Sequence, residues 1–139
     1  FKPDGLGLAE FERMKSHTTI GASMMEKVIR QSGADLFGMA YLICLNHHER
    51  WDGTGYPEGL SGENIPLEAR IMALADVYDA LLSKRVYKNA MSMEEAREWI
   101  RKGAGTQFDP DMVTVMLSTI GRFEEIYLKF QDDEVTLAV

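Results

Sequence analysis

Apolar residues recur at three- and four-residue intervals along almost the whole chain, and this spacing limits the fold more than any other feature. It is typical of one face of an α-helix, whereas a half-buried strand alternates between apolar and polar residues, and no window of the chain sustains that alternation. A chain of 139 residues buries enough surface for one core and hardly more. The sequence therefore predicts one all-α domain, a helical bundle of about six to seven helices.

Local signals predict where several helices begin and where the chain leaves helical structure. Ser92 with Glu95 three residues later is a capping box, and Asp109 followed by Pro110 is typical of an N-cap and a first helical residue. Four glycines within residues 53–62 predict a loop of tight turns. The predicted helices cover residues 8–15, 18 or 19 to 30, 35–48, 67–82, 92–102, 109–120 and 124–130.

Charge and composition exclude several classes of partner. A net charge of −7 argues against DNA and against an anionic membrane surface, because both bind basic proteins. The longest apolar stretch, residues 39–45, is far shorter than the roughly 20 residues that cross a bilayer. The single cysteine, Cys44, excludes an internal disulfide and favours a reducing, cytoplasmic location. The chain begins with Phe1 and has no basic-then-apolar leader, which predicts a piece of a longer, unsecreted protein.

The three histidines are the first candidates for chemistry. His47 and His48 stand side by side where an apolar helix is predicted to open into the glycine-rich loop, so both can face one cavity. Imidazole binds Zn, Fe, Ni or Cu, and added carboxylates favour Fe, Mn or Mg. Because no cysteine cluster lies nearby, an open site for hydrolysis is favoured over a structural zinc site. His17 alone has the alternative of an ordinary surface histidine.

A helix in the second half of the chain supplies two carboxylates. Asp76 lies between two apolar neighbours and is predicted to face inward, where an acid needs a partner or a metal ion. Asp79 is predicted to lie on a solvated helix edge, and Arg70 is an alternative partner for either acid. A metal ligand and a neutralised buried acid thus both remain open for Asp76.

A basic island and two aromatic residues are candidates for ligand contacts. Arg85 and Lys88 belong to a stretch without acids and predict a phosphate clamp, with helix-end charge as the alternative. Trp51 and Tyr56, in or beside the glycine-rich loop, have two interpretations, stacking on a nucleobase or filling the core. For Trp51 the core is favoured.

Taken together, these segments resemble one known family, the HD-GYP domain. The resemblance rests on residues 47–62 (HHERWDGTGYPEGLSG), 65–66 (IP), 69–71 (ARI) and 75–80 (ADVYDA). It extends over about residues 2–130, which predicts a domain at 1–130 and an acidic, frayed tail at 131–139. The resemblance implies an all-α bundle of the HD phosphohydrolase type that hydrolyses cyclic di-guanylate (cyclic di-GMP) to linear pGpG and in some cases GMP.

The resemblance also implies a role for each matching residue. The implied metal ligands, which are also the catalytic residues, are His17, His47, His48 and Asp76. The implied contacts to the cyclic dinucleotide are Gly55, Tyr56, Pro57, Arg85 and Lys88. Two or three divalent metal ions are implied for an intact domain, with Fe or Mn favoured and Zn, Ni or Mg as further options, and they supply a hydroxide that attacks phosphorus in line.

One departure from the family pattern affects the expected activity. The family carries a His-Asp pair upstream, and no histidine precedes His17 in this chain. We therefore expect an N-terminally incomplete domain that is a weak or inactive hydrolase by itself. The implied partners are cyclic di-GMP, an upstream sensor or receiver domain, other signalling domains and a second copy in a homodimer. The alternatives are a non-catalytic module that binds cyclic di-GMP or docks another protein, and a relative that cleaves another phosphoester.

Overall fold

The computed structural model describes residues 7–32, 36–83 and 90–136, and these residues form an all-α fold. No strand occurs within these ranges, which hold only an isolated bridge between Ala104 and Phe108. The prediction of an all-α chain is confirmed. The helices in the described ranges are α1 (Leu8–Ser32), α2 (Leu36–Asn46), the 3₁₀ helix η1 (Gly62–Asn64), α3 (Leu67–Leu82), α4 (Met93–Lys102), α5 (Pro110–Ser118) and α6 (Ile120–Thr136).

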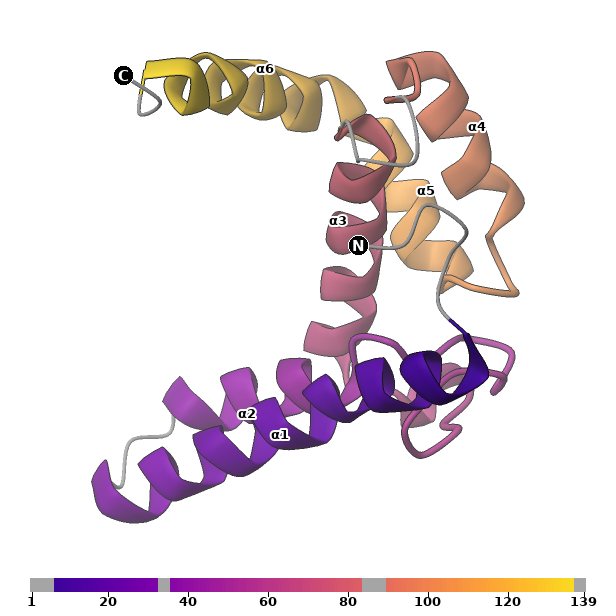
Figure 1. Ribbon diagram of the computed structural model, residues 1–139. Coiled ribbons are helices and arrows are strands. Elements are labelled where there is room, and N and C mark those ends of the chain that lie inside the picture. Colours follow the sequence, from indigo (N-terminus) through magenta and orange to yellow (C-terminus); the bar gives the residue numbers. More distant parts are fainter. Residues whose placement is uncertain (1–6, 33–35, 84–89, 137–139) are drawn as a thin grey trace.

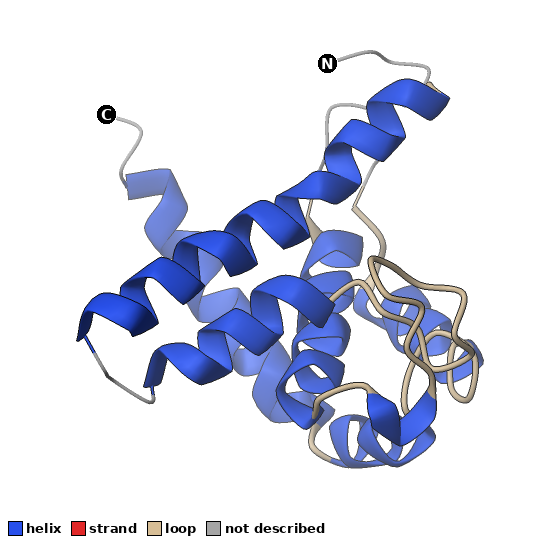
Figure 2. Cartoon of the chain, turned by 90° about the horizontal axis from the view of Figure 1, so that it is seen from below, coloured by secondary structure: helices blue, strands red, loops and turns tan. Residues whose placement is uncertain are grey.

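The helices form two groups (Figure 1). α1 and α2 run antiparallel, side by side, and Figure 2 shows the same pair from below. α3 leads away from this pair and packs against α4 and α5, while α6 follows α5 at the far end of α3. The glycine-rich loop connects the end of α2 to the start of α3, so it lies where the two groups meet. No helix in the described ranges is both long and apolar enough to cross a membrane.

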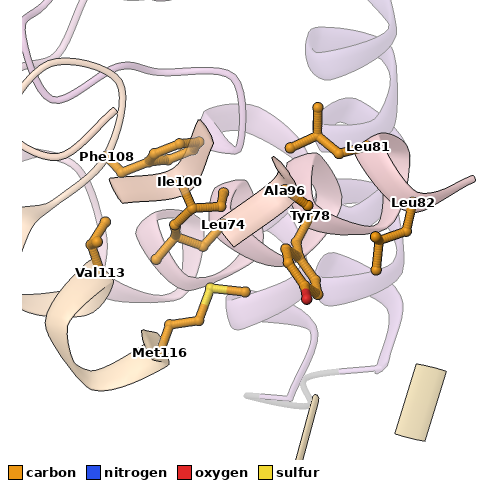
Figure 3. Packing of buried hydrophobic residues seen from close by; sticks show 9 residues of the cluster. All are labelled: Leu74, Tyr78, Leu81, Leu82, Ala96, Ile100, Phe108, Val113 and Met116. Carbon is orange, nitrogen blue, oxygen red and sulfur yellow. The ribbon is translucent and has the colours of Figure 1, made fainter. Parts of the chain in front are cut away.

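The main hydrophobic core lies in the second group, between α3, α4 and α5 (Figure 3). Its two large, fully buried apolar side chains are Ile100 of α4, with none of its surface exposed, and Phe108, with 2% exposed. The cluster consists of Leu74, Tyr78, Leu81, Leu82, Ala96, Ile100, Phe108, Val113 and Met116. α1 and α2 instead hold together by close approach: a Cβ on Gly21 would lie 3.4 Å from Cβ and Sγ of Cys44.

Two helix starts predicted from capping residues are confirmed. The backbone N–H of Glu95 donates to Ser92 Oγ at 3.3 Å, and the Ser92 N–H donates to Glu95 Oε2 at 2.9 Å, which completes the capping box of α4. Asp109 Oδ1 accepts the N–H of Asp111 at 2.9 Å and that of Met112 at 3.3 Å, so it caps α5.

The predicted break between the first two helices is wrong, because α1 is continuous from Leu8 to Ser32. The Thr18 hydroxyl donates to the Lys15 carbonyl at 2.9 Å, and the Thr19 hydroxyl donates to Ser16 at 3.0 Å. These hydroxyls bond back to the preceding turn and do not cap a new helix. The buried face of α1 carries Thr18, which is fully buried, whereas Met24 is 59% exposed.

The ends of three other helices differ from the prediction. α2 ends at Asn46, two residues before the predicted end, so both members of the histidine pair lie in the following turn. α5 ends at Ser118 and α6 begins at Ile120, four residues before the predicted start, so Gly121 lies inside the first turn of α6. α6 continues to Thr136, beyond the predicted end at residue 130. The domain limits 1–130 and 131–139 stay a prediction.

Candidate metal centre

The structure brings all three histidines together. His17 lies in α1, and His47 and His48 lie in the turn directly after α2, so the antiparallel pairing of the helices places the two segments side by side. One ring nitrogen from each histidine lies within 4.8 Å of the other two. Nε2 of His17 lies 3.3 Å from Nε2 of His47.

Two of the rings are turned so that Nε2 faces the cluster. His17 Nδ1 lies 2.7 Å from the Met14 carbonyl oxygen, and His47 Nδ1 lies 2.8 Å from that of Ile43. A neutral ring that donates Nδ1–H to a carbonyl keeps its lone pair on Nε2, which is the usual arrangement of a metal-binding histidine. Two such lone pairs 3.3 Å apart repel each other unless a proton or a metal ion lies between them.

The spacing of these nitrogens fits a shared metal ion. Imidazole nitrogens bind Zn²⁺ at about 2.0–2.1 Å, and two of them on one ion at angles of about 90–110° lie about 2.8–3.4 Å apart. The observed 3.3 Å between His17 Nε2 and His47 Nε2 falls in this range. Imidazole ligands suit several divalent metals, so the donor set fits the predicted group without selecting one ion.

His48 completes the cluster as an uncharged ring. Its centroid lies 4.1 Å from that of His47 and 5.0 Å from that of His17. Burial, followed by the charges of His47 and His17, lowers the pKa of His48 to about 4, although Asp76 acts in the opposite direction. His48 therefore holds a free lone pair at neutral pH, as a metal ligand must.

Asp76 is not one of the groups whose ligand atoms meet within 4.8 Å, and it is not buried, so its predicted inward position is wrong. Its side chain on α3 is exposed, which removes the need for an internal partner. Its charge still acts on the site, because it raises the pKa of His48 and, after burial, that of Tyr56. Asp79 is exposed as predicted. Arg70 instead forms an ion pair with Asp109, with Nη1 2.7 Å from Oδ2.

The glycine-rich loop places Tyr56 beside the histidines. The ring of Tyr56 stacks on His48, with centroids 4.9 Å apart and planes at 30°, and its backbone N–H donates to the His48 carbonyl at 3.2 Å. Gly55 passes so close to the backbone that a Cβ would lie 2.4 Å from the Arg50 nitrogen. Pro57 is exposed. Of these three residues, Tyr56 therefore lies directly against one histidine of the cluster.

Other candidate residues have different surroundings. Trp51 is half-buried, with the Arg70 guanidinium 5.9 Å from its ring centroid, which favours the structural interpretation. Arg85 and Lys88, the predicted phosphate contacts, lie outside the described residues. Sequence reasoning assigned no role to Lys15, whose Nζ lies 5.5 Å from the centroid of the Tyr56 ring. It also assigned none to Glu49, which is buried directly after the histidine pair.

The comparison with known families agrees with this geometry. The family described as HD domain matches residues 2–112, which include the histidine cluster and the glycine-rich loop. The chain belongs to the HD domain family. Membership implies a divalent metal site, and the three imidazoles of this HD domain fit one.

Curated relatives refine the assignment. The chain is 48% identical over 135 residues to a probable cyclic di-GMP phosphodiesterase of Vibrio cholerae, covering 96% of this chain and 31% of the relative. It is 48% identical over 132 residues to a cyclic di-GMP phosphodiesterase of the same organism, covering 94% of this chain and 27% of the relative. A 3'3'-cGAMP-specific phosphodiesterase 2, also of Vibrio cholerae, is 37% identical over 131 residues, with 94% and 24% covered.

These relatives confirm the predicted HD-GYP type, and at the level of the family they confirm an enzyme. The chain spans 31% and 27% of the length of the first two relatives. The activities named for these longer relatives therefore enter as a proposal about this chain.

Proposed function

We propose that this HD domain binds divalent metal ions through His17, His47 and His48, with Asp76, and hydrolyses a phosphodiester bond of cyclic di-GMP. The proposal rests above all on three imidazole nitrogens within 4.8 Å of one another. The names of the two relatives at 48% identity support cyclic di-GMP as the substrate. When bound, a divalent ion supplies positive charge to the phosphoryl oxygens and activates a water molecule.

The residues around the cluster have distinct parts in this proposal. The carbonyls of Met14 and Ile43 fix the directions of two rings, so the ligands need little rearrangement on binding. Tyr56, with Gly55 and Pro57, forms the wall on which the cyclic dinucleotide lies beside His48. Lys15 lies at that wall and is paired with Glu12, with Nζ 2.8 Å from Oε1, so its charge there is balanced by a carboxylate.

Chromatography of reaction mixtures tests the proposal. The chain loaded with Mn²⁺ or Fe²⁺ is incubated with cyclic di-GMP, and pGpG and GMP are measured over time. We expect product that disappears with a chelator and in His47→Ala, while Lys129→Ala on the exposed side of α6 leaves the rate unchanged. Because the chain supplies only three imidazoles, we expect a slow rate. Equal turnover by wild type and His47→Ala would refute the proposal.

The relative named for 3'3'-cGAMP favours a second candidate substrate. The two cyclic dinucleotides differ in one base, so the metal centre acts on the same phosphodiester chemistry in both. Competition between them in one reaction, with both products measured, distinguishes the candidates. A preference for 3'3'-cGAMP would move the assignment to that substrate.

The non-catalytic alternative makes a different prediction. A module that only binds cyclic di-GMP or docks another protein would give heat of binding in calorimetry with no product formed. The predicted upstream sensor or receiver domain, the homodimer and Fe or Mn as the metal remain parts of the proposal. The cytoplasmic location also stays a prediction, and it rests on Cys44, which is a free thiol in the structure.

A further inference from the structure

Glu49 is a buried carboxylate whose partners are all backbone groups of one loop. Only 4% of its surface is exposed. Oε1 accepts the backbone N–H of Glu58 at 2.7 Å and that of Gly59 at 3.1 Å, while Oε2 accepts the N–H of Leu60 at 3.0 Å. A buried charge is stable only where such groups replace water, so the loop and the carboxylate fix each other.

The loop that Glu49 holds also carries Tyr56. Tyr56 is tied to His48 twice, by the 3.2 Å hydrogen bond from its N–H to the His48 carbonyl and by the stacked ring at 4.9 Å. Between these residues the two backbone segments approach so closely that no side chain fits at Gly55, because a Cβ there would lie 2.5 Å from the Cα of Glu49. The loop thus folds back over the segment that follows α2. Glu49 binds the loop at residues 58–60, and Tyr56 stacks on His48.

We propose that Glu49 is a positioning residue of the metal centre, which acts on His48 through the loop and the ring of Tyr56. By holding the amides of residues 58–60, Glu49 keeps Tyr56 on the face of His48 and so directs that imidazole toward the other two. The inference rests on the part of the proposed function in which the three histidines hold a divalent ion. It does not depend on the substrate.

Glutamine at this position makes a specific test, because it keeps the size of the side chain and removes one acceptor. With its oxygen in the place of Oε1, the amide NH₂ points at the N–H of Leu60, donor against donor. The end of the loop at Leu60 is then released. Loss of groups that orient metal ligands typically weakens metal binding about 10- to 100-fold, so we expect the Kd for a metal ion to rise about tenfold in Glu49→Gln.

Titration of the 139-residue chain with Co²⁺ measures this effect without any substrate. The visible absorption of bound Co²⁺ reports both the amount bound and the geometry of the imidazole ligands. Glu63→Gln is the matched control, because it makes the same chemical change at an exposed acid in η1. We expect Glu49→Gln to have a higher Kd for Co²⁺ and an altered spectrum. Glu63→Gln should have the Kd and the spectrum of the wild type. Equal Kd and spectra in the two variants would overturn the inference.

A double substitution separates positioning from general destabilisation. If Glu49 acts through Tyr56, the variant carrying both Glu49→Gln and Tyr56→Leu loses no more Co²⁺ affinity than the weaker-binding single variant. Two independent effects would instead multiply, and a multiplied loss overturns the inference. Circular dichroism establishes that each variant is folded at the temperature of the titration.

Glu49→Asp keeps the test decisive should Glu49→Gln fail to fold. Aspartate retains both acceptor oxygens on a side chain one methylene shorter, so it cannot reach all three amides as glutamate does. We therefore expect weaker Co²⁺ binding than in the wild type and a shifted spectrum. Unchanged binding in Glu49→Asp would then count against the inference. Co²⁺ binding without hydrolysis by the wild type would refute the proposed function alone, whereas hydrolysis with unaffected Co²⁺ binding in Glu49→Gln would refute only the role of Glu49.

Discussion

Three glycines allow one substitution, glycine to alanine, to be compared in three backbone settings. A Cβ on Gly55 would lie 2.4 Å from the Arg50 nitrogen and 2.5 Å from the Glu49 Cα. Both are backbone atoms, so no side chain can turn away to relieve the contact. At Gly62 the space is open but φ is +57°, a conformation that other residues rarely adopt. At Gly121, inside α6, the space is open and φ is not positive.

The expected changes in the free energy of unfolding differ in sign. Gly62→Ala should destabilise the chain by about 1–2 kcal/mol, the strain of the left-handed conformation. Gly55→Ala should destabilise it by about 3 kcal/mol, the upper end of the range for overpacking, because the loop must shift to admit the methyl group. Gly121→Ala should stabilise it by about 0.5–1 kcal/mol through higher helix propensity.

Urea unfolding at 25 °C, followed by circular dichroism, measures all three changes with a common slope. The comparison is internal, since each variant gains the same methyl group. The reasoning about the loop is refuted if Gly55→Ala is as stable as the wild type, or if it loses less than Gly62→Ala. A destabilised Gly121→Ala would contradict the placement of that glycine inside a regular helix.

Two further predictions concern ion pairs away from the metal centre. Asp109→Ala removes both the buried partner of Arg70 and the cap of α5, so urea unfolding should show that the free energy of unfolding falls by about 3–5 kcal/mol. Asp109→Asn still caps the helix and should lose less stability. Equal losses in the two variants would exclude a contribution from the cap. The Arg97 guanidinium and the Tyr78 hydroxyl lower the pKa of Glu124 from 4.5, so its stabilisation is complete above that pH and is lost as pH falls through the folded pKa. Thermal unfolding between about pH 6 and 3 should therefore show a shallower acid decline in Glu124→Gln than in the wild type, and parallel declines would contradict this account.

Features decided within a few residues were predicted well from the sequence. The caps at Ser92 and Asp109 depend on partners no more than three positions away, so the sequence contains the whole interaction. The break proposed near Thr18 failed because a hydroxyl either caps a helix or bonds to the preceding turn. Packing decides between these options, and the full burial of Thr18 within α1 settles it.

The metal centre was predicted in its residue types and only partly in its arrangement. Spacing identified the pair His47 and His48, but its meeting with His17 depends on how α1 and α2 pack, which no local pattern states. The apolar neighbours of Asp76 wrongly suggested burial, since part of α3 faces solvent there. The role of Glu49 left no pattern in the sequence, because its partners are backbone amides, and every residue except proline has one.

The pairing of α1 with α2 has a consequence for stability measurements. His17 and His47 are 30 positions apart in the chain, so an ion shared by their rings would act as a reversible cross-link between α1 and the turn that follows α2. Ligands that bind only the folded state raise its stability, by about 2.7 kcal/mol at a free concentration of 100 times Kd. The melting temperature of this chain should thus work as a gauge of metal occupancy, rising in steps with the affinity of each ion offered to it.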